Sequence, residues 1–210
     1  MLTNIKHEYR TAFFLSLFTI TANLVEGVFS TILGQKDGTL ALFGFGLDSF
    51  IEVISAVGIS MMILRIARSP ESSRSKFEIT ALRITGASFF LLTAGLVVTA
   101  VLNIIQGAKP ETAVSGLIIS IISLSVMVFL YRAKLKVGRQ LDSDPIIADA
   151  NCTKTCIYMS VVLLASSLIY MLTGFAYVDI IGALGIAWFA FSEGREAFEK
   201  ASGKEDCHCE

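Results

Sequence analysis

Six long apolar blocks constrain the fold of this chain more than any other feature of its sequence. Each block is close to the ~20 residues that a helix needs to cross the hydrocarbon core of a bilayer. The blocks cover residues 11–33, 40–66, 79–105, 112–131, 146–172 and 177–191. The breaks between them are short, and they are polar or rich in Gly and Pro. We therefore predict an all-α polytopic membrane protein, folded as a bundle of six transmembrane helices.

The composition supports the same class. The chain has 210 residues, of which 54% are apolar and only 17% are charged, whereas a soluble domain has about 45–50% apolar and about 25% charged residues. The first block is too long for the core of a signal peptide and lacks a clear small-residue cleavage site, so we predict that it is retained as a span. The net charge of −1 gives no reason to expect a nucleic-acid partner.

Basic residues fall on alternate connections. They lie around the second and fourth breaks and near the two ends of the chain: Lys6, Arg10, Arg65, Arg68, Arg74, Lys76, Arg83, Arg132, Lys134, Lys136, Arg139, Arg195, Lys200 and Lys204. The other three breaks hold only Lys36 and Lys109. With six spans, the basic segments all face one side of the membrane, which the positive-inside rule makes cytoplasmic. We expect a transmembrane domain over residues 1–200, a cytosolic Cys/His tail over residues 201–210, and both termini in the cytoplasm, at the plasma (inner) membrane.

Two carboxylates interrupt the second apolar block. Asp48 and Glu52 are four residues apart, so on a helix they lie on one stripe, about 6 Å apart along the axis. A charged side chain inside a membrane costs roughly 2.5–3.5 kcal/mol on insertion scales, and it is retained where it binds or relays something. The pair therefore suggests half of a metal site. The competing interpretation is an ion pair with an intramembrane base, for which Lys154 is the only basic residue that the predicted spans hold deep enough.

The fifth block carries a second pair, Cys152 and Cys156, with Asp149 on the same face of a helix. The predicted topology makes the second and fifth spans antiparallel, and spans that face each other would offer two oxygen and two sulfur ligands. Such a set suits Zn²⁺, and its heavier relative Cd²⁺, better than Mg²⁺ or Ca²⁺. The competing interpretation is that the cysteines only fill space in an apolar helix. No cysteine falls in a loop predicted to lie outside, so we expect no disulfide framework.

These motifs resemble those of the cation diffusion facilitator (cation efflux) family. The stretch GTLALFGFGLDSFIEVIS is similar to the family's second span, in which Asp or His is followed four residues later by Asp; these positions are Asp48 and Glu52 here. The stretch ADANCTKTC is similar to its fifth-span pattern Ala-Asp-x-x-His-x-x-x-Asp. Asp149 matches that pattern, whereas Cys152 stands where the family has His and Cys156 stands where it has Asp.

The resemblance covers about residues 11–200, and it implies what the chain does. It implies a homodimeric membrane transporter, surrounded by lipid, that exports a divalent transition-metal ion from the cytoplasm in exchange for protons. The metal would bind Asp48, Glu52, Cys152 and Cys156, with Asp149 close by. Zn²⁺ is the first expected ion and Cd²⁺ the next, because the two cysteines soften the site. The alternative is a metal-binding membrane protein with a structural or regulatory role and no transport.

The ends of the chain also differ from the usual family pattern. Family members usually carry a cytosolic metal-binding domain after the sixth span, and we expect this chain to be a short member that lacks it. The last residues, Asp206-Cys207-His208-Cys209-Glu210, are either soft ligands that capture a metal ion or a solvated tail.

Other polar residues in the spans leave more than one interpretation. Asn23 and Glu26 lie one turn apart, and they either shape the ion path, take the exchanged proton, or satisfy each other or the backbone. Asp179 is expected to be exposed at the outer start of the last span. An enzyme is not expected: the chain has only His7 and His208, both near its ends, so no Ser–His or Cys–His pair falls within a span.

Overall fold

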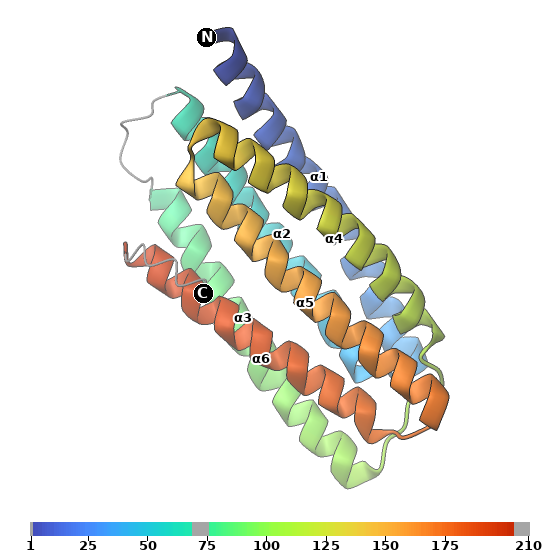
Figure 1. The fold of residues 1–210 in the computed structure, drawn as a ribbon. Coiled ribbons are helices and arrows are strands. Elements are labelled where there is room, and N and C mark those ends of the chain that lie inside the picture. Colours follow the sequence, from blue (N-terminus) through green and yellow to red (C-terminus); the bar gives the residue numbers. More distant parts are fainter. Residues whose placement is uncertain (1, 69–75, 204–210) are drawn as a thin grey trace.

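The structure is a computed structural model, and it describes residues 2–68 and 76–203 (Figure 1). Those residues form six α-helices and no strand. The helices are α1 (Leu2–Asp37), α2 (Leu40–Arg68), α3 (Lys76–Gln106), α4 (Val114–Leu141), α5 (Asp144–Thr173) and α6 (Tyr177–Ala201). The predicted all-α class and the order of the six helices are confirmed. Of the predicted Cys/His tail over residues 201–210, residues 204–210 lie outside the described residues, and Ala201 is the last residue of α6.

Five of these helices are long and apolar enough to cross a membrane. The qualifying segments are Tyr9–Asp37, Leu40–Arg65, Leu82–Gln106, Val114–Leu141 and Asp149–Thr173. In α6 the apolar run is shorter, because Glu193, Arg195 and Glu196 follow soon after Phe191. With 25 residues, α6 still extends for about 37 Å at the usual helical rise, which exceeds the thickness of a hydrocarbon core. It packs along α3, α2 and α5 as part of the same bundle.

Several helices continue past the predicted span boundaries. The largest difference is in α4, which runs on to Leu141 through a basic segment that we expected to be a connection. Lys, Arg, Leu and Gln favour helix, so this segment has no reason to unwind where the apolar block ends. The helix stops at Asp142, which adopts a left-handed conformation with φ 49°. The expectation of a basic loop is therefore wrong for this segment, and Lys134 belongs to a helix that faces the rest of the bundle.

Successive helices run in opposite directions (Figure 1). α2 contacts α1, α3, α5 and α6, while α4 contacts α1 and α5. The start of α1, the end of α6 and the α4–α5 connection lie at the same end of the bundle. α2 and α5 are thus antiparallel neighbours, as predicted from the sequence.

The bundle is apolar on the outside and partly polar inside. Leu91 and Leu172 expose 75% and 77% of their surface, as do many other large apolar side chains to a lesser degree. The buried polar and charged side chains include Asn23, Asp48, Ser123, Lys134, Asp149 and Asp179. Water-soluble proteins show the opposite tendency. The pattern is that of helices whose outer surface meets lipid and whose ionisable groups face the bundle interior.

Asp179 is buried, which corrects the expectation that it is exposed. Its carboxylate accepts hydrogen bonds from the backbone N–H groups of Leu40, at 2.7 Å, and Ala41, at 3.2 Å. These are the first two residues of α2, whose N–H groups have no partner within the helix. A negative charge also interacts favourably with the positive end of a helix dipole. α6 therefore fixes the start of the helix that carries Asp48 and Glu52.

Candidate metal centre

A small cavity, lined by several polar side chains, lies where the helices meet. Its volume is about 40 Å³, which exceeds the space that one water molecule needs and is enough for a metal ion with a water ligand. Each of the six helices contributes at least one residue to its lining. The lining includes four of the five predicted site residues, namely Glu52, Asp149, Cys152 and Cys156.

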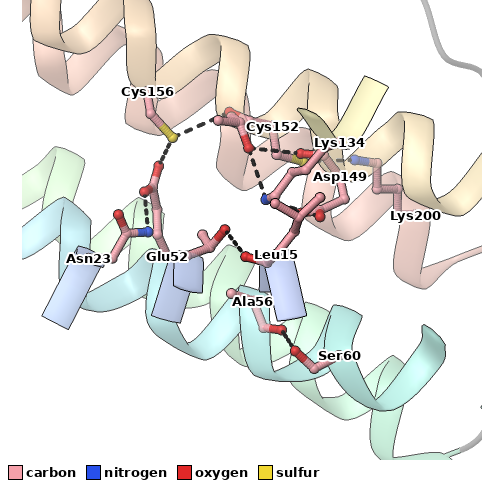
Figure 2. A network of polar contacts seen from close by, with 12 residues as sticks. Leu15, Asn23, Glu52, Ala56, Ser60, Lys134, Asp149, Cys152, Cys156 and Lys200 are labelled. Atoms are coloured by element: carbon pink, nitrogen blue, oxygen red, sulfur yellow. Dashed lines mark hydrogen bonds and ion pairs between the residues drawn. The ribbon is translucent and has the colours of Figure 1, made fainter. Parts of the chain in front are cut away.

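Glu52 and Cys156 meet across the interface between α2 and α5. The Cys156 thiol donates a hydrogen bond to Oε1 of Glu52. Asn23 on α1 donates a second bond, from Nδ2 to Oε2 of Glu52, at 2.8 Å (Figure 2). The antiparallel packing of α2 and α5 thus brings one predicted oxygen ligand and one predicted sulfur ligand into direct contact. Both groups must be deprotonated to bind a metal ion, so metal binding would break this hydrogen bond.

Cys152 lies one helical turn before Cys156 and lines the same cavity. Its Sγ lies 3.5 Å from Nζ of Lys200, which reaches in from α6, and Lys200 also pairs with Glu196 at 2.6 Å. The Cys156 Sγ lies 3.4 Å from the backbone carbonyl of Cys152. Both cysteines are free thiols. The fifth-span pair therefore offers two sulfurs to the cavity from one helix face.

Asp48 behaves differently from the other predicted ligands. It is buried on α2, one turn before Glu52, but it does not line the cavity. Its Oδ1 atom has no hydrogen-bond partner among the described residues. A buried carboxylate oxygen without a partner is costly, so this group has a spare acceptor facing the interior of the bundle.

Asp149 is held by Lys134, a residue that we expected to lie in a connection between spans. Nζ of Lys134 lies 3.0 Å from both carboxylate oxygens of Asp149 and 3.1 Å from Oγ1 of Thr153. The expectation that Lys154 is the only base deep in the bundle is therefore wrong. Nζ of Lys154 instead lies 5.8 Å from the centre of the Tyr158 ring, while the oxygens of Glu52 are bonded to Asn23 and Cys156.

The complete ligand set stays a prediction. Across residues 2–68 and 76–203, no three side chains from His, Cys, Asp and Glu lie close enough together to hold a metal ion. The structure brings Glu52 and Cys156 into contact and puts Cys152 on the same cavity wall. It leaves Asp48 one turn away and pairs Asp149 with Lys134.

A family model described as the cation efflux transmembrane domain matches residues 13–203. The chain belongs to this family. Its members are membrane transporters of divalent cations and not enzymes, which confirms both the resemblance and the expectation that the chain is not an enzyme.

Curated relatives of this cation efflux domain come from bacteria and an archaeon. The chain is 24% identical to the magnetosome protein MamB of Magnetospirillum gryphiswaldense, over 88% of this chain and 63% of that protein. It is 29% identical to an uncharacterised transporter of Methanocaldococcus jannaschii, over 83% and 64% of the two chains. It is 23% identical to the manganese efflux system protein MneP of Bacillus subtilis, over 86% and 64%. The chain thus spans about three-fifths of the length of these relatives.

Two charged residues of this cation efflux domain line the cavity although we did not predict them there from the sequence. They are Lys134 on α4 and Glu193 on α6. A signal existed for Lys134, because it continues the buried stripe of α4 through Met127 and Leu130 at helical spacing. Glu193 shares a face of α6 with Lys200, seven residues later, but only the tertiary structure brings that face to Cys152.

Asn23 and Glu26 each form a hydrogen bond with a different residue. Asn23 bonds to Glu52, whereas Glu26 accepts a hydrogen bond from Oγ of Ser49 at 2.9 Å. Both partners are on α2, so the two residues tie α1 to α2 instead of satisfying each other. Asn23 thereby orients the carboxylate of the predicted metal site, which is the usual role of a group behind a ligand.

Proposed function

We propose that this chain exports a divalent transition-metal ion, Zn²⁺ first and Cd²⁺ next, from the cytoplasm. The observation that carries the proposal is the contact between Glu52 and Cys156 across the α2–α5 interface. A carboxylate and a thiol on two antiparallel helices, with Cys152 on the same cavity wall, form a mixed oxygen and sulfur donor set. Placing such polar, ionisable groups inside the membrane costs free energy, so they are expected there mainly where they bind an ion or a partner group.

The choice of metal follows from the sulfur atoms. One relative is named a manganese efflux system protein, and Mn²⁺ prefers carboxylate, carbonyl and water ligands. This chain has Cys152 and Cys156 at the cavity instead. Thiolates favour Zn²⁺ and the softer Cd²⁺, so we rank these two ions above Mn²⁺.

The proposed driving force is proton exchange. Thiol and carboxyl groups must lose their protons to bind a metal ion, and the Cys156–Glu52 hydrogen bond holds such a proton where the ion would sit. Metal arriving from the cytoplasm displaces it, and protons from outside later release the metal. Movement of the helices about the cavity would expose it first to one side and then to the other.

The orientation and the assembly belong to the same proposal. The distribution of basic residues supports cytoplasmic termini in the plasma (inner) membrane. The family resemblance supports a homodimer. Light scattering of the detergent-solubilised chain measures the oligomer, and labelling of single cysteines introduced near Arg10 or into the α3–α4 connection measures the orientation.

The test is a metal-by-metal flux screen in proteoliposomes. Vesicles that contain the chain are loaded with a metal-sensitive dye and offered Zn²⁺, Cd²⁺ or Mn²⁺. We expect Zn²⁺ and Cd²⁺ to enter faster than Mn²⁺, and protein-free vesicles to show no such uptake. Tight binding of Zn²⁺ without any flux would support the alternative, a metal-binding membrane protein that does not transport.

A further inference from the structure

Lys134 is a buried cation on the wall of the metal cavity. Its side chain exposes only 3% of its surface, and that of its partner Asp149 exposes 6%. Charged groups this deeply buried are found almost only in pairs, because an unpaired buried charge is strongly destabilising. This pair lies beside a cavity that is expected to receive a second cation, the metal ion.

Lys134 contacts both oxygens of the Asp149 carboxylate beside the cavity. Nζ of Lys134 lies 3.0 Å from each oxygen, and the same ammonium group donates to Oγ1 of Thr153 at 3.1 Å. Thr153 in turn donates to the backbone carbonyl of Asp149 at 3.2 Å. The lysine and the aspartate are therefore fixed by contacts with each other and with one shared threonine (Figure 2).

The Lys134–Asp149 pair determines which atoms of α5 remain available to bind a metal ion. Asp149, Cys152 and Cys156 lie on one face of α5, and Lys134 neutralises the only carboxylate among them. An ion in the cavity then meets two sulfurs from α5, and carboxylates only from the other helices, at Glu52 on α2 and Glu193 on α6. Without Lys134, the same face would present a carboxylate beside the sulfurs, and carboxylate oxygens suit Mn²⁺.

We propose that Lys134 is a selectivity-determining residue that holds Asp149 away from the transported ion and so keeps the site sulfur-rich. This inference rests on the proposed function, since it concerns the ions that the cavity accepts. Lys134 acts through Asp149 and does not bind the ion. It is thus a positioning residue, and removing its charge should change which metal is preferred.

The test compares Lys134→Met with the double variant Lys134→Met/Asp149→Asn in the full chain. Mn²⁺ and Cd²⁺ affinities are measured by equilibrium dialysis of the detergent-solubilised protein, and the two fluxes are measured in proteoliposomes. We expect Lys134→Met to raise the ratio of Mn²⁺ to Cd²⁺ affinity by at least about tenfold, because Asp149 becomes available to the harder ion. The double variant, which lacks both charges, should return the ratio to within about twofold of the wild-type value. Lys154→Met is the matched control, since that lysine lies over Tyr158, and it should leave the ratio unchanged.

The outcomes separate this inference from the proposed function. A folded Lys134→Met variant with the wild-type ratio overturns the inference, as does a double variant that keeps a raised ratio. If Lys134→Met alone does not fold, the double variant decides: a wild-type ratio supports the inference, and weakened Cd²⁺ binding shows that Asp149 itself binds the ion and overturns it.

A wild-type chain that binds Cd²⁺ but moves none contradicts only the proposed function, while the affinity ratios still test Lys134. A wild-type chain that binds neither ion overturns both.

Discussion

Glu52 is the residue on which most of the proposed chemistry converges. It accepts hydrogen bonds from α1, through Asn23, and from α5, through Cys156. A carboxylate with one donor on each oxygen is held in a single orientation, which is what a metal ligand needs. Asp48, one turn earlier, has one carboxylate oxygen without a hydrogen-bond partner among the described residues. The two acids proposed to bind the same ion therefore differ in how firmly their carboxylates are held.

The first prediction is that Glu52→Gln and Asp48→Asn each abolish metal flux while the chain stays folded. Both substitutions keep the side-chain shape and remove a charge that is costly in a membrane. The loss should exceed the roughly 10–100-fold that is typical of residues that only support a ligand. Cd²⁺ uptake by proteoliposomes measures it, with gel filtration as the folding check.

Glu199→Gln is the matched control for that experiment. The Glu199 side chain is 50% exposed and pairs with Arg195 at 3.4 Å, an interaction worth about 0.3–0.5 kcal/mol at most. The Glu199→Gln variant should transport Cd²⁺ at the wild-type rate. Wild-type uptake by Glu52→Gln would show that the site is elsewhere.

The second prediction concerns the two sulfurs. A double variant, Cys152→His with Cys156→Asp, should restore the family's usual ligand types at these positions. We expect Zn²⁺ transport to be retained and the preference for Cd²⁺ over Zn²⁺ to fall, because thiolates favour the softer ion. Competition between the two ions in one vesicle assay gives the ratio directly. If the ratio does not change, the cysteines do not contact the ion.

At the scale of elements, α6 supports the helix that carries the acids. Asp179 caps the first N–H groups of α2 through contacts of 2.7 and 3.2 Å. In the same bundle, α5 presents Cys156 to Glu52 on α2, because the two helices are antiparallel and in contact. The cavity of the proposed metal site therefore depends on the packing of α2 against two later helices.

The third prediction is that Asp179→Ala destabilises the bundle by about 2 kcal/mol, the upper end of the range for a lost helix cap. Removing the carboxylate leaves two buried N–H groups of α2 without a partner, and such groups are costly away from water. The midpoint of thermal unfolding in detergent should fall. Glu111→Ala, at an exposed acid near the same end of the bundle, should change the free energy of unfolding by less than about 0.5 kcal/mol and so lower the midpoint much less. Equal midpoints for the two variants would show that the cap contributes nothing.

At the scale of the whole molecule, periodicity and charge predicted the six helices and their alternating directions. They also predicted that α2 and α5 are antiparallel, because long apolar blocks leave few alternatives to an antiparallel bundle, and in this arrangement Glu52 meets Cys156. The role of Lys134 was missed. The positive-inside rule assigns basic residues to connections, whereas a lysine inside a helix can be buried if a carboxylate on another helix meets it. Asp179 was missed for a similar reason, since its partners are the backbone of α2, far away in sequence.

The central claim is that metal and protons exchange at the Glu52–Cys156 pair. The most direct test is a proteoliposome that contains two dyes, one for Zn²⁺ and one for pH, with wild-type chain and Glu52→Gln measured side by side. Because thiol and carboxyl ligands release protons when they bind metal, we expect Zn²⁺ entry to be accompanied by proton movement in the opposite direction. Zn²⁺ flux should increase when the pH on the side from which the metal binds is raised from about 6 to about 8, as the ligands lose their protons. Both signals should be absent in Glu52→Gln. Zn²⁺ flux that is insensitive to pH and occurs without opposing proton movement would contradict the account.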